Sequence, residues 1–276
     1  IVIPYEGDAK QASVVLKNGT ETIPSIVTKF PEKDSLQVWF RPLKADSLSV
    51  SISQDKFKKD FNVRIKDSKR DTLGFSPKQS GILHFRDRFA INSLLPVASI
   101  DNSKIQLSKK DSSAVAFKTA YDAFTQNVYI DFEKEPLEEY HVKLLPGALK
   151  DYLDTANDTL NYSLKTLSIA EYANMNVVLK NVKRFPVIVE LANAKGEVVA
   201  SEYSEGSTQI TFSGLQPARL LLRAIYDDNK NKAWDTGSYL EKRLPEEVIY
   251  YKNASSKDEI DVRANWEMNQ DFDLSQ

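Results

Sequence analysis

The sequence predicts an all-β protein built from tandem antiparallel β-sandwich domains. Short runs of about five residues alternate apolar and polar side chains, which is the period of a half-buried strand. Turn-forming residues separate these runs at spacings of roughly 8–12 residues, as in sandwich domains. No segment of the 276 residues carries the long 3.6-residue periodicity of an amphipathic helix. These observations favour antiparallel sandwiches over alternating strand and helix units.

The first 78 residues contain five such runs. They lie at residues 13–16, 25–29, 36–40, 48–52 and 61–65. In the fourth run, leucine, valine and isoleucine alternate strictly with two serines, so one face of that strand is predicted to be buried. Asn18-Gly19 and Pro42 end the first and third runs with turn or stop signals. We therefore expect a first β-sandwich domain over residues 1–78.

The chain starts inside a strand-like pattern. Its first three residues are apolar and β-branched, and they show neither an initiator methionine nor a signal-peptide pattern. We expect the chain to belong to a longer protein, with the first domain incomplete on its N-terminal side.

A second domain is predicted over residues 79–167. Proline and glycine cluster at 76–81 before it, and a break at 168–170 follows it. The expected strands are 82–85, 104–107, 128–132, 140–145 and 160–164. Residues 147–151 are expected to form one turn before the last of these strands.

Four short motifs follow one another within this domain. They are Leu95-Pro96-Val97, Asp101 with Ile105-Gln106-Leu107, Leu137 with Tyr140-His141-Val142-Lys143-Leu144, and Pro146 through Asp151. Their order resembles that of bacterial Ig-like domains of the SbsA or Big_5 type. The glycine that usually follows the last aspartate is absent here. The resemblance implies a spacer or interaction module without chemistry of its own.

The third predicted domain covers residues 168–276 and begins with a strand at 176–180. Runs at 187–191 and 198–202 flank a turn at 193–196, which indicates a β-hairpin. A strand at 209–212, a turn ending at Pro217 and a long run at 218–226 follow. This order is similar to transthyretin-like or carboxypeptidase-regulatory-like sandwiches, although Ala218 stands where that family usually has glycine.

The most specific resemblance lies in residues 223–251 and 260–274. These segments are similar to the C-terminal end of Ig-like surface or envelope lipoproteins of Bacteroidota. The resemblance implies an exported protein of the outer membrane, with its lipid-carrying cysteine upstream of residue 1. It also implies that the partners are other outer-membrane or surface proteins.

Composition excludes several classes of function. Lys and Arg total 37 against 39 Asp and Glu, so a net charge of −2 gives no basic footprint for nucleic acid or anionic lipid. Without cysteine the chain has no disulfide, thiol nucleophile or cysteine zinc site. No apolar run approaches the ~18 residues of a membrane helix. Membrane contact is therefore expected only through the upstream anchor.

The polar loop at residues 227–237 matches part of a calcium-loop pattern. Positions one, three, five and nine of that pattern would be Asp227, Asn229, Asn231 and Asp235. Ca²⁺ prefers hard oxygen ligands, which these side chains offer. Lys232 and Ser238 replace the usual glycine and bidentate glutamate, so any calcium site is predicted to be weak. The alternative is a loop whose side chains bond to its own backbone.

Three tryptophans are candidates for contact with a partner: Trp39, Trp234 and Trp266. Exposure of all three on one surface would favour the alternative function, a carbohydrate-binding accessory module of the cell surface. For Trp234, the competing interpretation is a side chain folded back over the open end of the sandwich.

The sequence lacks the catalytic motifs that can be tested. It has no G-x-S-x-G elbow, no glycine-rich phosphate loop and no H-E-x-x-H. Its two histidines, His84 and His141, fall in separate predicted strands, and the acidic pair at 246–247 is expected to face solvent. We predict a non-enzymatic scaffold or accessory subunit of an envelope protein complex, with weakly bound Ca²⁺ as the one candidate cofactor.

Overall fold

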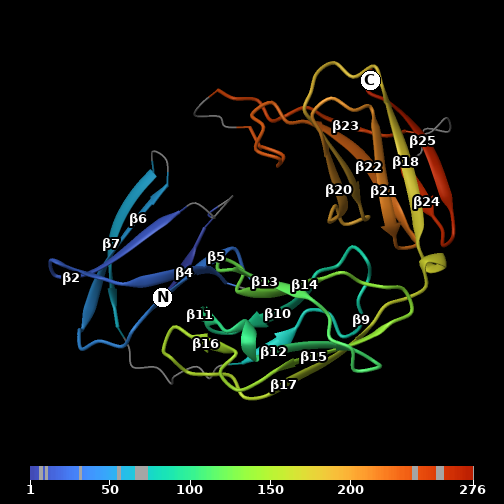
Figure 1. Ribbon diagram of the computed structural model, residues 1–276. Helices are drawn as coiled ribbons and strands as arrows, with labels where there is room; N and C mark the ends of the chain where they lie inside the picture. The colour runs from blue at the N-terminus through green and yellow to red at the C-terminus, as the bar shows by residue number, and fades with distance from the viewer. Residues whose placement is uncertain are drawn as a thin grey trace. The chain divides into compact units, whose positions relative to one another are not determined.

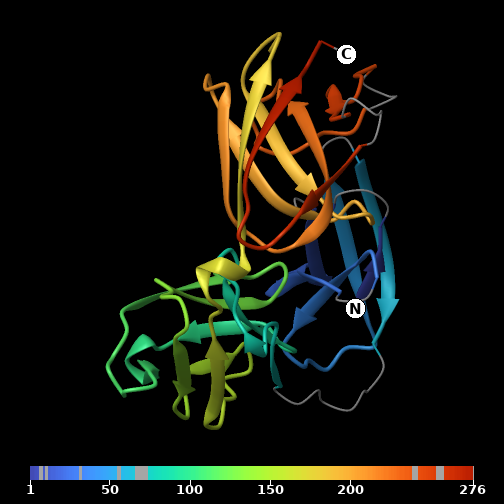
Figure 2. The same cartoon turned by 90° about the vertical axis from the view of Figure 1, so that its right-hand side faces the viewer.

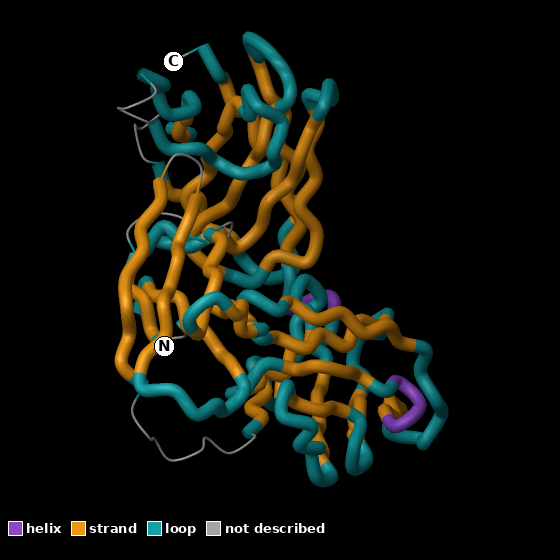
Figure 3. The backbone as a smooth tube through the Cα atoms, turned by 90° about the vertical axis from the view of Figure 1, so that its left-hand side faces the viewer, coloured by secondary structure: helices purple, strands orange, loops and turns teal. Residues whose placement is uncertain are grey.

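The computed structural model describes residues 1–5, 9, 12–30, 33–54, 57–65, 74–237, 242–252 and 258–275. Regular structure in these residues is almost wholly β, which confirms the predicted fold class (Figure 3). The helical segments among them are two 3-10 turns, η1 (Asn102–Lys104) and η2 (Ile169–Glu171). No helix of the described part is long and apolar enough to cross a membrane.

The chain divides into two compact units (Figure 1). Unit 1 comprises residues 1–83 and 87–166, and unit 2 comprises residues 84–86 and 167–276. Unit 1 contains two hydrophobic clusters, whereas unit 2 contains one. The finer division into three domains at 78/79 and 167/168 stays a prediction.

The first cluster of unit 1 lies between two antiparallel sheets. One sheet has the order β1 (Val2–Pro4), β5 (Ser35–Phe40), β4 (Ser25–Lys29). The other has the order β3 (Glu21–Ile23), β2 (Ser13–Asn18), β6 (Ser47–Gln54), β7 (Phe57–Arg64). The predicted alternation holds in β6, where Leu48 and Val50 are buried while Ser49 is exposed.

The second cluster of unit 1 lies between two four-stranded sheets. The first has the order β13 (Phe117–Asp122), β14 (Asn127–Phe132), β10 (Phe89–Ser93), β8 (Phe75–Pro77). The second has the order β12 (Ile105–Lys109), β15 (Glu139–Leu144), β17 (Leu160–Lys165), β9 (Gly81–Ile82). The chain thus enters through one sheet at β8 and changes to the other at β9, which pairs with β17 in parallel.

Two local predictions for this region were wrong. The strand expected at 82–85 ends at Ile82, and His84–Arg86 belongs to unit 2. The turn expected at 147–151 is in part β16 (Leu149–Asp151), which pairs with β11 (Val97–Ile100). Asp154, three residues after Asp151, has a φ of 66°, a conformation that glycine adopts readily.

A buried polar contact joins the two halves of unit 1. The indole N–H of Trp39 donates to Thr28 Oγ1 at 2.8 Å, and the amide of Gln126 donates to the same oxygen at 3.1 Å. All three side chains are buried. The backbone N–H of Lys29 also donates to the carbonyl of Phe124 at 2.7 Å. These bonds tie β4 and β5 to the turn between β13 and β14.

Unit 2 is a sandwich of two sheets around one core. The smaller sheet has the order β21 (Gln209–Leu215), β18 (Ala173–Lys180), β25 (Glu267–Asp273). The larger has the order β20 (Val198–Ser204), β19 (Val187–Ala192), β22 (Ala218–Tyr226), β23 (Val248–Tyr250), with β24 (Glu259–Val262) also paired to β22. Figure 2 shows β18 in yellow and β25 in red running in the same direction.

Candidate functional site

The loop after β22 brings the four predicted calcium ligands together. Asp227 is fully buried at its start, and its carboxylate oxygens accept the N–H groups of Asn231 at 3.1 Å and Lys232 at 3.0 Å. Asp235 Oδ2 accepts both side-chain amides, from Asn229 at 2.5 Å and from Asn231 at 2.6 Å. The two asparagines thus bond to Asp235 through their amide nitrogens, and Asp227 bonds to the backbone of the loop.

The side-chain oxygens of the two asparagines are bonded to backbone within the loop. Asn229 Oδ1 accepts the N–H of Asn231 at 3.1 Å, and Asn231 Oδ1 accepts the N–H of Ala233 at 2.8 Å. These are the bonds of the alternative hypothesis, in which the loop caps itself. No group of three or more His, Asp or Glu residues suited to a metal occurs in the described part of the chain. The calcium site stays a prediction from sequence.

Glu246 completes this loop and was missed by the sequence analysis, which placed the pair at 246–247 in solvent. It is 8% exposed, and its carboxylate accepts the N–H of Asp228 at 2.9 Å and that of Asp235 at 3.1 Å. Its own N–H donates to the carbonyl of Asp235 at 3.1 Å. One buried carboxylate thus holds both ends of the loop. A contact over 11 to 18 positions leaves no periodic signal in the sequence.

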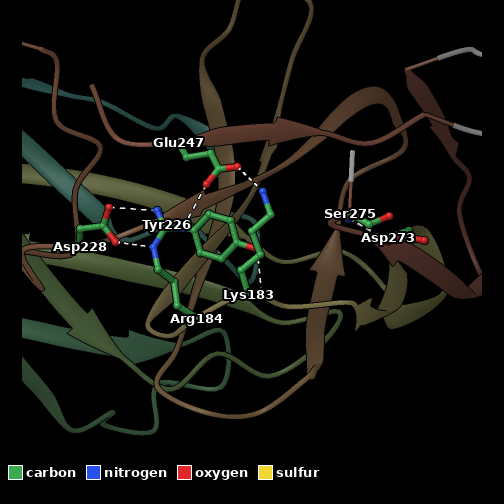
Figure 4. Close-up of polar contacts among 7 residues, drawn as sticks. All are labelled: Lys183, Arg184, Tyr226, Asp228, Glu247, Asp273 and Ser275. Carbon is green, nitrogen blue, oxygen red and sulfur yellow. Dashed lines mark hydrogen bonds and ion pairs between the residues drawn. The ribbon is translucent and has the colours of Figure 1, made fainter. Parts of the chain in front are cut away.

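An ion-pair cluster lies beside this loop (Figure 4). Arg184 binds Asp228 through two hydrogen bonds, Nε to Oδ1 at 2.6 Å and Nη2 to Oδ2 at 3.0 Å. Its Nη1 donates to Glu247 at 3.1 Å, and Lys183 Nζ reaches the same carboxylate at 2.7 Å. The guanidinium lies 4.2 Å from the ring centroid of Tyr226, in cation–π geometry. The cluster joins three separate segments of unit 2.

The pKa values in this cluster follow from its hydrogen bonds. Arg184 lowers the pKa of Asp228, and Lys183 followed by Arg184 lowers that of Glu247. The same carboxylates raise the pKa of Arg184. Asp273, also drawn in Figure 4, has a lowered pKa because Asn181 and the N–H of Ser275 bond to it. All of these shifts favour the charged forms of the groups concerned.

The three candidate tryptophans are separated. Trp39 lies in unit 1 and is 8% exposed, so its ring is packed and its indole N–H is bonded to Thr28. Trp234 is 46% exposed, and its indole N–H donates to the carbonyl of Glu246 at 3.3 Å. Trp266 is 47% exposed, with the Arg263 guanidinium 5.1 Å from its ring centroid. Two of the three are therefore about half exposed.

The two exposed tryptophans lie at opposite ends of unit 2. The carbonyl of Trp266 accepts the N–H of Asn174, at the start of β18. The loop of Trp234 follows Tyr226, whose hydroxyl accepts the N–H of Lys183 beyond the end of β18. The eight residues of β18 separate these ends by about 26 Å at ~3.3 Å per residue. Trp39, Trp234 and Trp266 do not form one row.

Comparison with known proteins identifies no family for this chain. No family model matches the sequence, and no curated protein matches it. Among solved structures, the chain is similar to the major pilin subunit BcpA of Bacillus cereus, at 10% identity over 95% of this chain and 94% of that one, with a TM-score of 0.25. It is also similar to the Bacillus anthracis TIE protein, at 11% identity over 95% and 47% of the two chains, with a TM-score of 0.24. Likeness at this level carries no argument about fold or function.

Proposed function

We propose that this chain is a non-enzymatic structural and interaction module of an exported cell-surface protein. In its finer form, the proposal is a scaffold or accessory subunit in an envelope complex, carried by an outer-membrane lipoprotein of Bacteroidota. The lipid anchor would lie upstream of residue 1, and the partners would be other outer-membrane or surface proteins. The sequence resemblance supports the finer form.

The proposal rests on the bonds that four acidic side chains form at one end of unit 2. Asp227 and Glu246, both buried, each accept two backbone N–H groups of one loop. Asp228 and Glu247 are bound to Arg184 and Lys183. Carboxylates engaged in this way fix the shape of loops at one end of a sandwich. A loop of fixed shape suits recognition of a partner, because little ordering entropy is lost on binding.

Trp234 is the residue at this end that is best placed to contact a partner. Its ring is half exposed, while its N–H is bonded to the carbonyl of Glu246. An aromatic ring held in one orientation by such a bond is typical of interface anchors. Leu244, at 85% exposed, lies two residues before Glu246 and adds apolar surface nearby in the chain.

The alternative function is binding of carbohydrate at the cell surface. A sugar platform of the expected kind needs several exposed rings in a row, and the three tryptophans are not arranged so. A single exposed ring at either end of unit 2 is the remaining basis for this alternative, so the protein-partner proposal is preferred.

The test is recovery of the parent protein from gently solubilised envelopes after brief chemical crosslinking. We expect it in a complex of fixed stoichiometry, and we expect Trp234→Ala to weaken that complex. Trp266→Ala is the matched control, because its ring is equally exposed at the opposite end of unit 2. Recovery of the parent as a free monomer under all conditions contradicts the proposal. An unchanged complex with Trp234→Ala removes this residue as the anchor.

A further inference from the structure

The smaller sheet of unit 2 joins its first and last strands in parallel. β18 and β25 pair in unbroken register from Asn174 with Glu267 to Lys180 with Asp273, seven pairs in all. Backbone bonds continue past both ends of this ladder. The N–H of Asn174 donates to the carbonyl of Trp266, and that of Leu274 donates to the carbonyl of Lys180, each at 2.9 Å.

Side chains reinforce the same pair on its outer face. Asn174 donates to Glu267 at 2.6 Å, Asn176 to Asn269 at 3.3 Å, and Asn181 to Asp273 at 2.9 Å. Lys180 forms an ion pair with Asp271. Each of these contacts connects β18 or the residue after it to β25. The two strands are therefore joined by side chains along most of their length.

The inner face of β25 anchors it to the core. Phe272 and Leu274 are fully buried in the cluster of unit 2, and the rings of Phe272 and Tyr251 pack edge to face with centroids 5.8 Å apart. The amide of Gln270 donates to the hydroxyl of Tyr251 at 2.7 Å. β25 is nevertheless an edge strand, with β18 as its hydrogen-bonded neighbour in the sheet.

The direction of the two strands decides how tension acts on them. Within residues 167–276 of unit 2, β18 is the first strand of the chain and β25 is the last. Tension applied between the residues just before β18 and those just after β25 pulls β18 back toward its start and β25 forward toward its end, along one axis. Because the hydrogen bonds of the ladder run across that axis, all seven pairs bear the load at the same time. Peeling the strands apart from one end would load one pair at a time.

We propose that the β18–β25 pair is a mechanical clamp, which makes unit 2 resist tension transmitted through the polypeptide. This function goes beyond the scaffold proposal and is independent of it, because it depends on the strand ladder and not on any partner. Unit 1 offers an internal comparison. Its parallel pair, β9 with β17, spans two residue pairs, so its ladder is expected to yield at lower force.

The test is single-molecule stretching of the full chain in two directions. The chain has no cysteine, so introduced cysteines serve as unique attachment points. Ala170→Cys with Ser275→Cys pulls along the ladder, whereas Lys183→Cys with Ser275→Cys pulls the pair apart from its far end. All three positions are exposed. At one pulling speed, we expect unit 2 to rupture at a several-fold higher force in the first geometry. Equal rupture forces in the two geometries overturn the proposal.

A matched pair of substitutions tests the ladder itself. Successive N–H groups of a strand point to opposite sides, and the N–H of Leu274 donates to β18. The N–H of Gln270 therefore faces β18, and that of Asn269 faces away from it. We expect Gln270→Pro to lower the rupture force along the ladder more than Asn269→Pro, with Gln270→Ala as the side-chain control. Equal rupture forces for the two proline variants overturn the proposal. If a proline variant fails to fold, the comparison of the two pulling directions in the cysteine variants still tests it.

Discussion

Arg184 and Asp228 are joined by two parallel hydrogen bonds, at 2.6 and 3.0 Å, across a sequence separation of 44 residues. A planar guanidinium matches a carboxylate in this geometry, which a lysine ammonium cannot reproduce. Both side chains are partly exposed, at 39% and 55%, so solvent screens the attraction. The pair is therefore expected to orient the loop more than to stabilise the unit.

This relationship predicts a specific pH dependence. The pKa values of Asp228 and Glu247 are lowered in the folded state from ordinary values of 3.8 and 4.5. A lowered folded-state pKa contributes stability that is present above the ordinary pKa and is lost as pH falls through the folded value. We expect Arg184→Gln to destabilise unit 2 by less than about 1 kcal/mol at pH 7 and to flatten its loss of stability below about pH 4.5.

Thermal melts between pH 3 and 7 measure this effect. Arg219→Gln is the control, because it removes the same charge from an exposed position on β22. An identical pH profile for Arg184→Gln and the unmutated chain contradicts the prediction.

Glu246→Gln should destabilise unit 2 more than Glu247→Gln. The Glu246 carboxylate is buried and accepts two backbone N–H groups, and glutamine would present an N–H₂ group to one of them. Leaving a buried donor unsatisfied costs about 1–3 kcal/mol. Glu247 is 38% exposed, so its neutralisation is expected to cost less. Urea unfolding of the two variants checks the order, and the reverse order refutes the role assigned to Glu246.

Calcium separates the two hypotheses for the 227–237 loop. A weak site, with a dissociation constant of roughly 10⁻⁴–10⁻³ M, would stabilise unit 2 by about 1.4 kcal/mol at ten times that concentration. The loop already satisfies Asp227 and both asparagines internally, so we expect no change in melting temperature between EDTA and millimolar calcium. A rise in the melting temperature that Asp235→Ala abolishes would establish the calcium site instead.

Residues 168–276 should unfold cooperatively when produced alone. The cluster of unit 2 draws all of its buried residues from positions 173–274, and about 110 residues can bury a sufficient core. This fragment lacks Arg86, which donates to the carbonyl of Ser213 at 2.9 Å and to Glu202 at 3.0 Å in the full chain. We expect the fragment to be less stable than unit 2 in the full chain, with Arg86→Ala in the full chain reproducing part of the loss. A gradual, non-cooperative melt counts against the boundary at 168.

Local pattern was enough to predict most strands. Alternation at 48–52 became β6, and the hairpin expected at 187–202 became β19 and β20, joined where the sequence has Asn193 to Gly196. These features depend on near neighbours and on turn residues. The bonds from Asn229 and Asn231 to their own loop match the self-capping alternative, which also depends on local spacing.

Contacts between distant residues could not be predicted in this way. The burial of Trp39 depends on Thr28 and on Gln126, 98 positions after Thr28. The role of Glu246 depends on where a long loop returns to the sheet. The parallel pairing of β18 with β25 joins residues 93 positions apart, and neither strand differs in pattern from an antiparallel one. Tertiary packing determines these long-range contacts, and the local sequence pattern around each residue does not reveal them.

The placement of His84–Arg86 in unit 2 has a consequence for synthesis of the chain. His84 Nδ1 lies 2.9 Å from the hydroxyl of Tyr172, which follows it by 88 positions, and Phe85 packs against the same ring. During translation these three residues are synthesised before residues 167–276, which make up the rest of unit 2. The contacts of His84 and Phe85 with Tyr172 can therefore form only after residues 87–166 have been synthesised. Slowing translation after residue 166 would lengthen the interval in which this segment is open to a chaperone or a protease.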